Sequence, residues 1–216
     1  MRTRIGLIGA VLGAAVGIFA MGSVAAHAQI KFSDLWKGHP LNNSVAFPAR
    51  MLATSGAKLK GTPSFSNQCA IRMGVALREA GVTLGQLGGV RVSWYHPKDK
   101  MYVLNAQELG NALARAGIQG LGKVEKYKGE DAKKFYSKMF GRTGIVFFKD
   151  YWSRSVRVSD GSGGTTWVKE SQPSGDHIDV WNGYRTSAAW LMEWFSWLGY
   201  YSNYINSKEI WFWEVK

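Results

Sequence analysis

The chain has 216 residues, with 27 Lys and Arg against 15 Asp and Glu, a single Cys and 5 Pro. This length predicts one domain, and an apolar fraction of 46% excludes a disordered chain. One Cys excludes an intramolecular disulfide scaffold, a Cys-rich zinc site and a CxxC redox pair. Four His leave little material for a multi-histidine metal centre, so we expect no metal site.

Residues 1–28 are predicted to be a secretory signal peptide. Two Arg lie in the first four residues, residues 5–20 form an uncharged apolar run, and residues 26–28 (AHA) fit a small-x-small cleavage site. The run is short for a membrane span, so we expect no stable span after cleavage, with an uncleaved anchor as the alternative. Cleavage leaves a single domain, residues 29–216, in the periplasm or outside the cell.

The mature chain is strongly basic. Loss of the two leader arginines lowers the formal net charge from +12 to +10. Such a charge attracts cell-wall polymer, lipid headgroups or nucleic acid, and a solvated basic surface without a partner is an equal alternative. The basic residues are scattered and form no nucleic-acid motif, so we expect no nucleic-acid partner.

The first half of the chain is predicted to be helical after an N-terminal extension. Apolar residues at helical spacing predict a helix that Ser66 or Asn67 caps and Gly81 ends. A second helix is expected over residues 105–116, beginning with a capping box, and a shorter one over residues 131–139.

The second half is predicted to be rich in strands. The expected strands are short, and they cover residues 143–149, 153–158, 165–169, 177–182 and 209–215. The second and third flank a Gly-rich turn and form a hairpin arm, and the last is apolar on both faces and therefore central. Residues 186–198 are expected to form an apolar helix. Helices followed by sequential strands predict an α+β fold with an antiparallel sheet.

Cys69 is the first candidate for chemistry. It falls in the first turn of the first predicted helix, where free amides and the helix dipole stabilise a thiolate. A buried structural Cys is the alternative, because free Cys commonly behaves as a small hydrophobe. Export favours the catalytic interpretation, since an unused thiol is a liability in an oxidising compartment.

A thiol enzyme also needs a base, and His177 is the best candidate. It begins a predicted strand, and Asp179 lies on the same face two residues later, whereas Asn182 has the opposite parity. His39 and His96 each precede Pro in loop-like surroundings and are predicted to be solvated. A half-buried strand histidine without a catalytic role is the alternative for His177. A helix-capped Cys followed by a strand His is the papain-like arrangement.

These segments resemble a known family, the fourth family of type VI secretion amidase effectors. The likeness covers nearly all of residues 31–215 and is carried by residues 67–73 (NQCAIRM), 175–183 (GDHIDVWNG), 32–36 (FSDLW), 143–149 (TGIVFFK) and 210–213 (IWFW). It implies a papain-like fold of the NlpC/P60 kind. It also implies a cysteine amidase, without metal or cofactor, that cuts peptidoglycan stem peptides between D-glutamate and meso-diaminopimelate.

The resemblance assigns Cys69 as nucleophile and His177 as general base and acid. The Asp that the family carries eleven residues after the His is Ala188 here, so the third role passes to Asp179 by strand parity, with Asn182 in reserve. The disulfide of some members cannot form with a single Cys. A signal peptide is unusual for an injected effector, so a periplasmic relative is an alternative to an antibacterial effector with a cognate immunity protein.

Trp152 and Arg154 are the predicted substrate contacts, together with Asn182. Trp167 and Arg157 lie nearby on the hairpin arm, and basic side chains there suit stem-peptide carboxylates. Two other functions stay open. One is a non-catalytic wall-binding or inhibitory module on the same fold, and the other is a cysteine acyltransferase.

Overall fold

The computed structural model describes residues 29–42, 68–94, 96–98, 101–187 and 204–216. The predicted signal peptide and nearly all of the helix expected over residues 186–198 lie outside these ranges. The prediction that Ser66 or Asn67 caps the first long helix is wrong, because that helix begins at Cys69 and its N-cap is Gln68, whose side chain makes no capping hydrogen bond. No helix of the described ranges has the length and apolar character needed to cross a membrane.

Helices precede most of the strands along the described chain. They are α1 (Phe32–Gly38), α3 (Cys69–Glu79), the 3-10 turn η2 (Leu84–Leu87), α4 (Ala106–Arg115), α5 (Glu130–Lys133) and α6 (Phe135–Met139). The predicted helix over residues 105–116 is confirmed, and the Asn105 side chain caps it by accepting a hydrogen bond from the Glu108 N–H at 2.9 Å. The helix expected over residues 131–139 is instead two short helices that meet at Lys134.

The strands form a four-stranded sheet and a separate ribbon. They are β1 (Glu125–Lys128), β2 (Gly144–Trp152), β3 (Ser155–Ser159), β4 (Thr165–Lys169), β5 (Gly175–Trp181) and β6 (Glu209–Glu214), with the 3-10 turn η5 (Tyr204–Asn206) before β6. The sheet order is β1-β6-β2-β5 and every pair is antiparallel. The apolar last strand is therefore central, as predicted, whereas β1 was not predicted.

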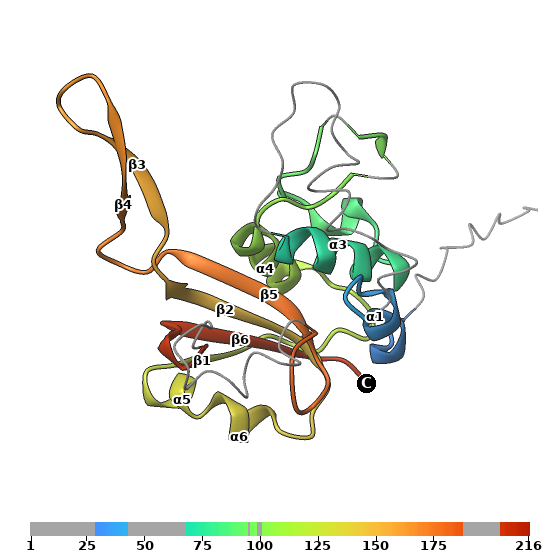
Figure 1. Ribbon diagram of the computed structural model, residues 1–216. Helices are drawn as coiled ribbons and strands as arrows, with labels where there is room; N and C mark the ends of the chain where they lie inside the picture. Colours follow the sequence, from blue (N-terminus) through green and yellow to red (C-terminus); the bar gives the residue numbers. More distant parts are fainter. Residues whose placement is uncertain (1–28, 43–67, 95, 99–100, 188–203) are drawn as a thin grey trace, which may run out of the picture.

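Helices cover both faces of the sheet. In Figure 1, α1, α3 and α4 lie on one side and α5 and α6 on the other. Alternate residues of β2 point to opposite faces, so Ile145 and Phe147 join the core under α3 and α4 while Val146 and Phe148 join the core under α6. This two-sided burial explains the unbroken apolar run of β2. The predicted α+β fold with helices packed on an antiparallel sheet is confirmed.

The ribbon of β3 and β4 projects away from the body (Figure 1). Arg157 pairs directly with Trp167 across the two strands, and every residue of β4 is exposed. The predicted hairpin arm is thus confirmed. An isolated two-stranded ribbon gains little stability from its own contacts.

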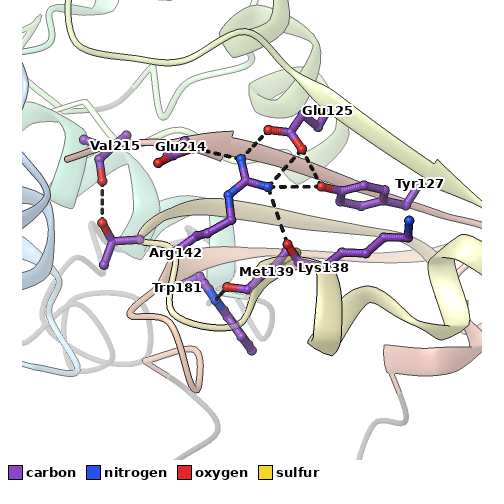
Figure 2. Close-up of polar contacts among 9 residues, drawn as sticks. Glu125, Tyr127, Lys138, Met139, Arg142, Trp181, Glu214 and Val215 are labelled. Atoms are coloured by element: carbon purple, nitrogen blue, oxygen red, sulfur yellow. Dashed lines mark hydrogen bonds and ion pairs between the residues drawn. The ribbon is translucent and has the colours of Figure 1, made fainter.

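Arg142 joins the second helical layer to two strands of the sheet (Figure 2). From the turn after α6, its guanidinium donates hydrogen bonds to Glu125 of β1 and to Glu214 of β6, the latter at 2.8 Å. Its Nη1 also lies 3.4 Å from the Tyr127 hydroxyl. Nearby, the Trp181 indole donates to the Met139 carbonyl at 3.0 Å. These bonds fix α6 to the sheet and link the edge strand β1 to its neighbour β6.

A glycine allows α1 to lie against α3. A Cβ placed on Gly38 would be 2.6 Å from the Glu79 Cβ, closer than carbon atoms pack. Only a residue without a side chain therefore fits at the end of α1. The contact brings the residue after it, His39, toward β5.

Candidate active site

Cys69 is the first residue of α3 and lies beside the edge strand β5. Its Sγ is 4.0 Å from the Asp176 carbonyl oxygen, and the Ile178 N–H hydrogen-bonds the sulfur. Asp176 O and Ile178 N project from the same edge of β5, so the thiol lies along that edge. The side chain is half-buried. The start of a helix places it among free backbone N–H groups, as predicted.

His177 on β5 faces the thiol. Its ring makes a hydrogen bond with Cys69 and stacks on Tyr204, with centroids 5.6 Å apart and an interplanar angle of 17°. On the same side it stacks on Phe148 at 6.3 Å. Rings stacked in this way restrict rotation of the imidazole, so its nitrogens keep their partners.

Asp179 is the third member of the cluster, and 1% of it is exposed. Its Oδ2 lies 3.4 Å from His177 Nε2, and its Oδ1 accepts a hydrogen bond from the Val180 N–H at 2.8 Å. The contact with His177 is an ion pair and not an aligned hydrogen bond, since Nε2 makes no bond of good geometry. Because Nε2 points at Asp179, Nδ1 is the ring nitrogen that can contact the Cys69 thiol.

The electrostatics of the three groups favour a thiolate–imidazolium pair. Burial alone would raise the pKa of the Cys69 thiol, but the hydrogen bond and charge of His177 outweigh it and hold that pKa below its usual value. Burial alone would lower the pKa of His177, but the Asp179 carboxylate and the Cys69 thiolate raise it to about 10. Both shifts favour a thiolate beside an imidazolium over a neutral thiol beside a neutral imidazole.

His39 corrects a prediction. The sequence predicted a solvated loop histidine, but only 1% of His39 is exposed and its Nε2 lies 3.3 Å from Asp179 Oδ1. Local signals failed because the burial comes from contacts with β5, far along the chain. No sequence pattern indicated this pairing. The site therefore contains a second histidine, on the opposite side of Asp179 from His177.

The remaining predicted residues surround the cluster at different distances. Arg154 Nη2 is 4.0 Å from Asp176 Oδ2, the side chain that precedes His177. Trp152 pairs with Gly175, where an added Cβ would be 2.1 Å from the indole nitrogen. Asn182 forms a turn after β5, since its side-chain oxygen accepts hydrogen bonds from Tyr184 and Arg185 backbone N–H groups, the former at 3.1 Å.

Asn182 does not contact His177 through any hydrogen bond among the described residues, so Asp179 and not Asn182 stands beside the imidazole. Gln68 precedes the thiol, is buried, and accepts a hydrogen bond from Arg72 Nη2 at 3.0 Å. Ala188, at the position where the family carries an Asp, lies outside the described ranges. Within those ranges no three His, Cys, Asp or Glu side chains are grouped to hold a metal ion.

Comparison with known proteins gives a family and a fold. Residues 65–213, more than half of the chain, match the family described as type VI secretion system (T6SS), amidase effector protein 4. A comparison with curated proteins finds no match.

Two solved structures share the fold. The effector Tae4 from Salmonella typhimurium, solved in complex with the immunity protein Tai4 from Enterobacter cloacae, is 17% identical, with 87% of this chain and 99% of that chain covered and a TM-score of 0.51. The effector Tae4 from Enterobacter cloacae is 15% identical, with 88% and 99% covered and a TM-score of 0.52. These likenesses confirm the papain-like fold type expected from the sequence.

Proposed function

Because the chain belongs to the type VI secretion amidase effector 4 family, we propose that it is a cysteine amidase of peptidoglycan stem peptides. The bond we assign is the one between D-glutamate and meso-diaminopimelate. One observation supports the mechanism most: a thiol at a helix start is hydrogen-bonded to a partly buried histidine whose other nitrogen faces a buried carboxylate. This arrangement supplies a nucleophile, a proton carrier and a group that orients the carrier.

The reaction begins with the thiolate of Cys69 and the imidazolium of His177. The sulfur attacks the carbonyl carbon of the D-glutamyl amide, and backbone N–H groups at the start of α3 stabilise the oxyanion. His177 gives its proton to the leaving nitrogen, the C–N bond breaks, and a thioester remains. A water molecule then loses a proton to His177 and attacks the thioester, which releases the D-glutamyl carboxylate and restores the thiolate.

Asp179 supports the charged imidazole through both halves of this cycle. Its carboxylate lies 3.4 Å from Nε2 and stabilises the protonated ring that precedes attack and follows hydrolysis. Asp179 thus takes the role that the family pattern gives to an Asp at position 188.

Substrate contacts are assigned to Trp152, Arg154 and Asn182. Arg154 lies next to the strand that carries His177, where a guanidinium can pair with carboxylates of the stem peptide. The exposed pair of Arg157 and Trp167 extends the same basic and aromatic surface along the arm, where it can contact the glycan.

The biological role we assign is that of an antibacterial effector acting in the periplasm. The net charge of +10 that remains after loss of the two leader arginines favours adsorption to an anionic wall. The solved Salmonella relative binds an immunity protein, and we assign this chain a cognate immunity protein of its own. The leader at residues 1–28 is assigned as a signal peptide that exports the domain across the inner membrane of the cell that makes it.

The function is tested by incubating the full chain and its Cys69→Ala variant with Gram-negative peptidoglycan. We expect tetrapeptide stems to disappear, and new diaminopimelate amino groups to appear in the mass spectra, with the wild type only. The loss in the variant should be about 10⁴-fold or more, as for other nucleophile deletions. A folded, reduced wild type that binds but does not cut would favour the wall-binding module, and an acylated product would favour the acyltransferase.

A further inference from the structure

We propose that His39 is a positioning residue of this site: it holds the Asp179 carboxylate from the side opposite His177, so that the reactive Cys69–His177 pair depends on it. The inference deepens the proposed function and rests on its thiol mechanism. Its basis is the geometry of a row of four side chains, of which His39 and Asp179 are buried and His177 and Cys69 are partly buried. The row runs from His39 to Asp179, His177 and Cys69.

The hydrogen bonds of His39 define which nitrogen carries its proton. Nδ1 accepts a hydrogen bond from the Leu41 backbone N–H at 3.4 Å, so in the neutral ring the proton is on Nε2. That nitrogen lies 3.3 Å from Asp179 Oδ1. His39 is therefore a donor to one carboxylate oxygen while His177 lies against the other.

The surroundings of His39 favour its neutral form. Burial lowers its pKa below the usual value, the Asp179 carboxylate opposes this, and the charges of Arg72 on α3 and His177 on β5 lower it further. A neutral donor orients the carboxylate without neutralising its charge. The full negative charge of Asp179 is thus kept for the imidazolium of His177.

The loop that carries His39 is fixed at several points. The His39 N–H donates to the Trp36 carbonyl, and the Asn42 side chain donates to the same carbonyl at 3.0 Å and to the Ser187 hydroxyl at 2.8 Å. Ser187 follows β5, so the loop is tied to the segment that continues from the catalytic strand. Such a supported contact is the kind that orients a catalytic group.

The test measures alkylation of Cys69 by iodoacetamide as a function of pH. Cys69 is the only cysteine in the chain, so the rate reports its thiolate alone and requires no substrate. His39→Asn keeps an oxygen near the Leu41 N–H but is too short to reach Asp179. His39→Gln places an amide nitrogen near the position of Nε2. His96→Leu, which changes a histidine that contacts Ser93 and Tyr102, is the control.

We expect the midpoint of the alkylation profile to move up by about one pH unit in His39→Asn, which is roughly tenfold less thiolate at a pH below the midpoint. The direction of the shift follows from the order of the contacts. Without the His39 contact, the Asp179 carboxylate is less firmly oriented and stabilises the imidazolium of His177 less. A smaller population of imidazolium in turn stabilises the Cys69 thiolate less. His39→Gln and His96→Leu should keep the wild-type midpoint.

An unchanged midpoint in folded His39→Asn overturns the proposal, and so does an equal shift in His39→Gln, because packing alone would then explain the effect. His39→Phe, which fills the ring volume without a donor, replaces His39→Asn if that variant does not fold. If the midpoints shift as expected but the wild type cuts no peptidoglycan, the assigned substrate is wrong and the role of His39 stands.

Discussion

Gly38→Ala should disturb both the packing of α1 and the chemistry of the site. The added Cβ would lie 2.6 Å from the Glu79 Cβ, whereas carbon atoms pack at about 3.5–4.0 Å. The two helices must therefore separate by about 1 Å. Overpacking of this kind costs about 1–3 kcal/mol, which corresponds to a fall of roughly 3–10 °C in Tm for a domain of this size.

The same displacement acts on the residue after Gly38. His39 Nε2 is now 3.3 Å from Asp179, and a further 1 Å takes the pair beyond hydrogen-bond range. Gly38→Ala should thus lower Tm and also raise the midpoint of Cys69 alkylation. Thermal unfolding followed by circular dichroism gives the first quantity, and the iodoacetamide profile gives the second.

Two variants test whether the close contact is the cause. Gly117→Ala adds a Cβ that meets no atom within 4 Å, so Tm should change little. Gly38→Ala combined with Glu79→Gly removes the opposing Cβ and should restore the alkylation midpoint, although glycine near the end of α3 itself costs up to about 1 kcal/mol. A Gly38→Ala protein that melts and reacts like the wild type would refute the reasoning.

Two further results are expected from surface groups. Arg142 holds the pKa of Glu125 below its usual value, chiefly through their hydrogen bonds. The stability that this pair adds is therefore fully present above the unfolded-state pKa of about 4.3. It is lost as the pH falls through the lower pKa that Glu125 has in the folded state. Thermal melts from pH 6 to pH 2 should therefore fall more steeply for wild type than for Arg142→Met, and parallel curves would contradict this pair. Trp167, which is 69% exposed, should tolerate Trp167→Ala without loss of Tm, while co-sedimentation with peptidoglycan in a Cys69→Ala background weakens several-fold. Unchanged sedimentation would remove the arm from the substrate surface.

The features that the sequence predicted well are those with a local cause. Alternation and apolar runs indicated β2, β5 and β6, and apolarity on both faces of β6 placed it in the middle of the sheet. The strand period brought His177 and Asp179 to one face. These patterns have a local cause, because successive side chains of a strand point to opposite faces and each face that meets a core is apolar.

The features that it missed have distant causes. β1 (EKYK) has no apolar alternation, and it is a strand because it pairs with β6 and its Glu125 and Tyr127 hydrogen-bond Arg142. His39 lies between Gly38 and Pro40, residues typical of an exposed loop, and it is buried because α1 packs on α3 beside β5. No local pattern encodes a contact between segments so far apart.

The position of β6 also determines when the sheet can be completed during synthesis. β6 follows every other strand of the sheet along the chain, yet it lies between β1 and β2, so β1 has no place to pair until β6 has left the ribosome. The first residue of α1 also depends on a late segment, because the Phe32 N–H donates to the Lys216 carbonyl at 2.9 Å. A nascent chain can form the β2–β5 pair but not the finished sheet, nor the anchored start of α1. The four-stranded sheet is thus completed only after translation of β6.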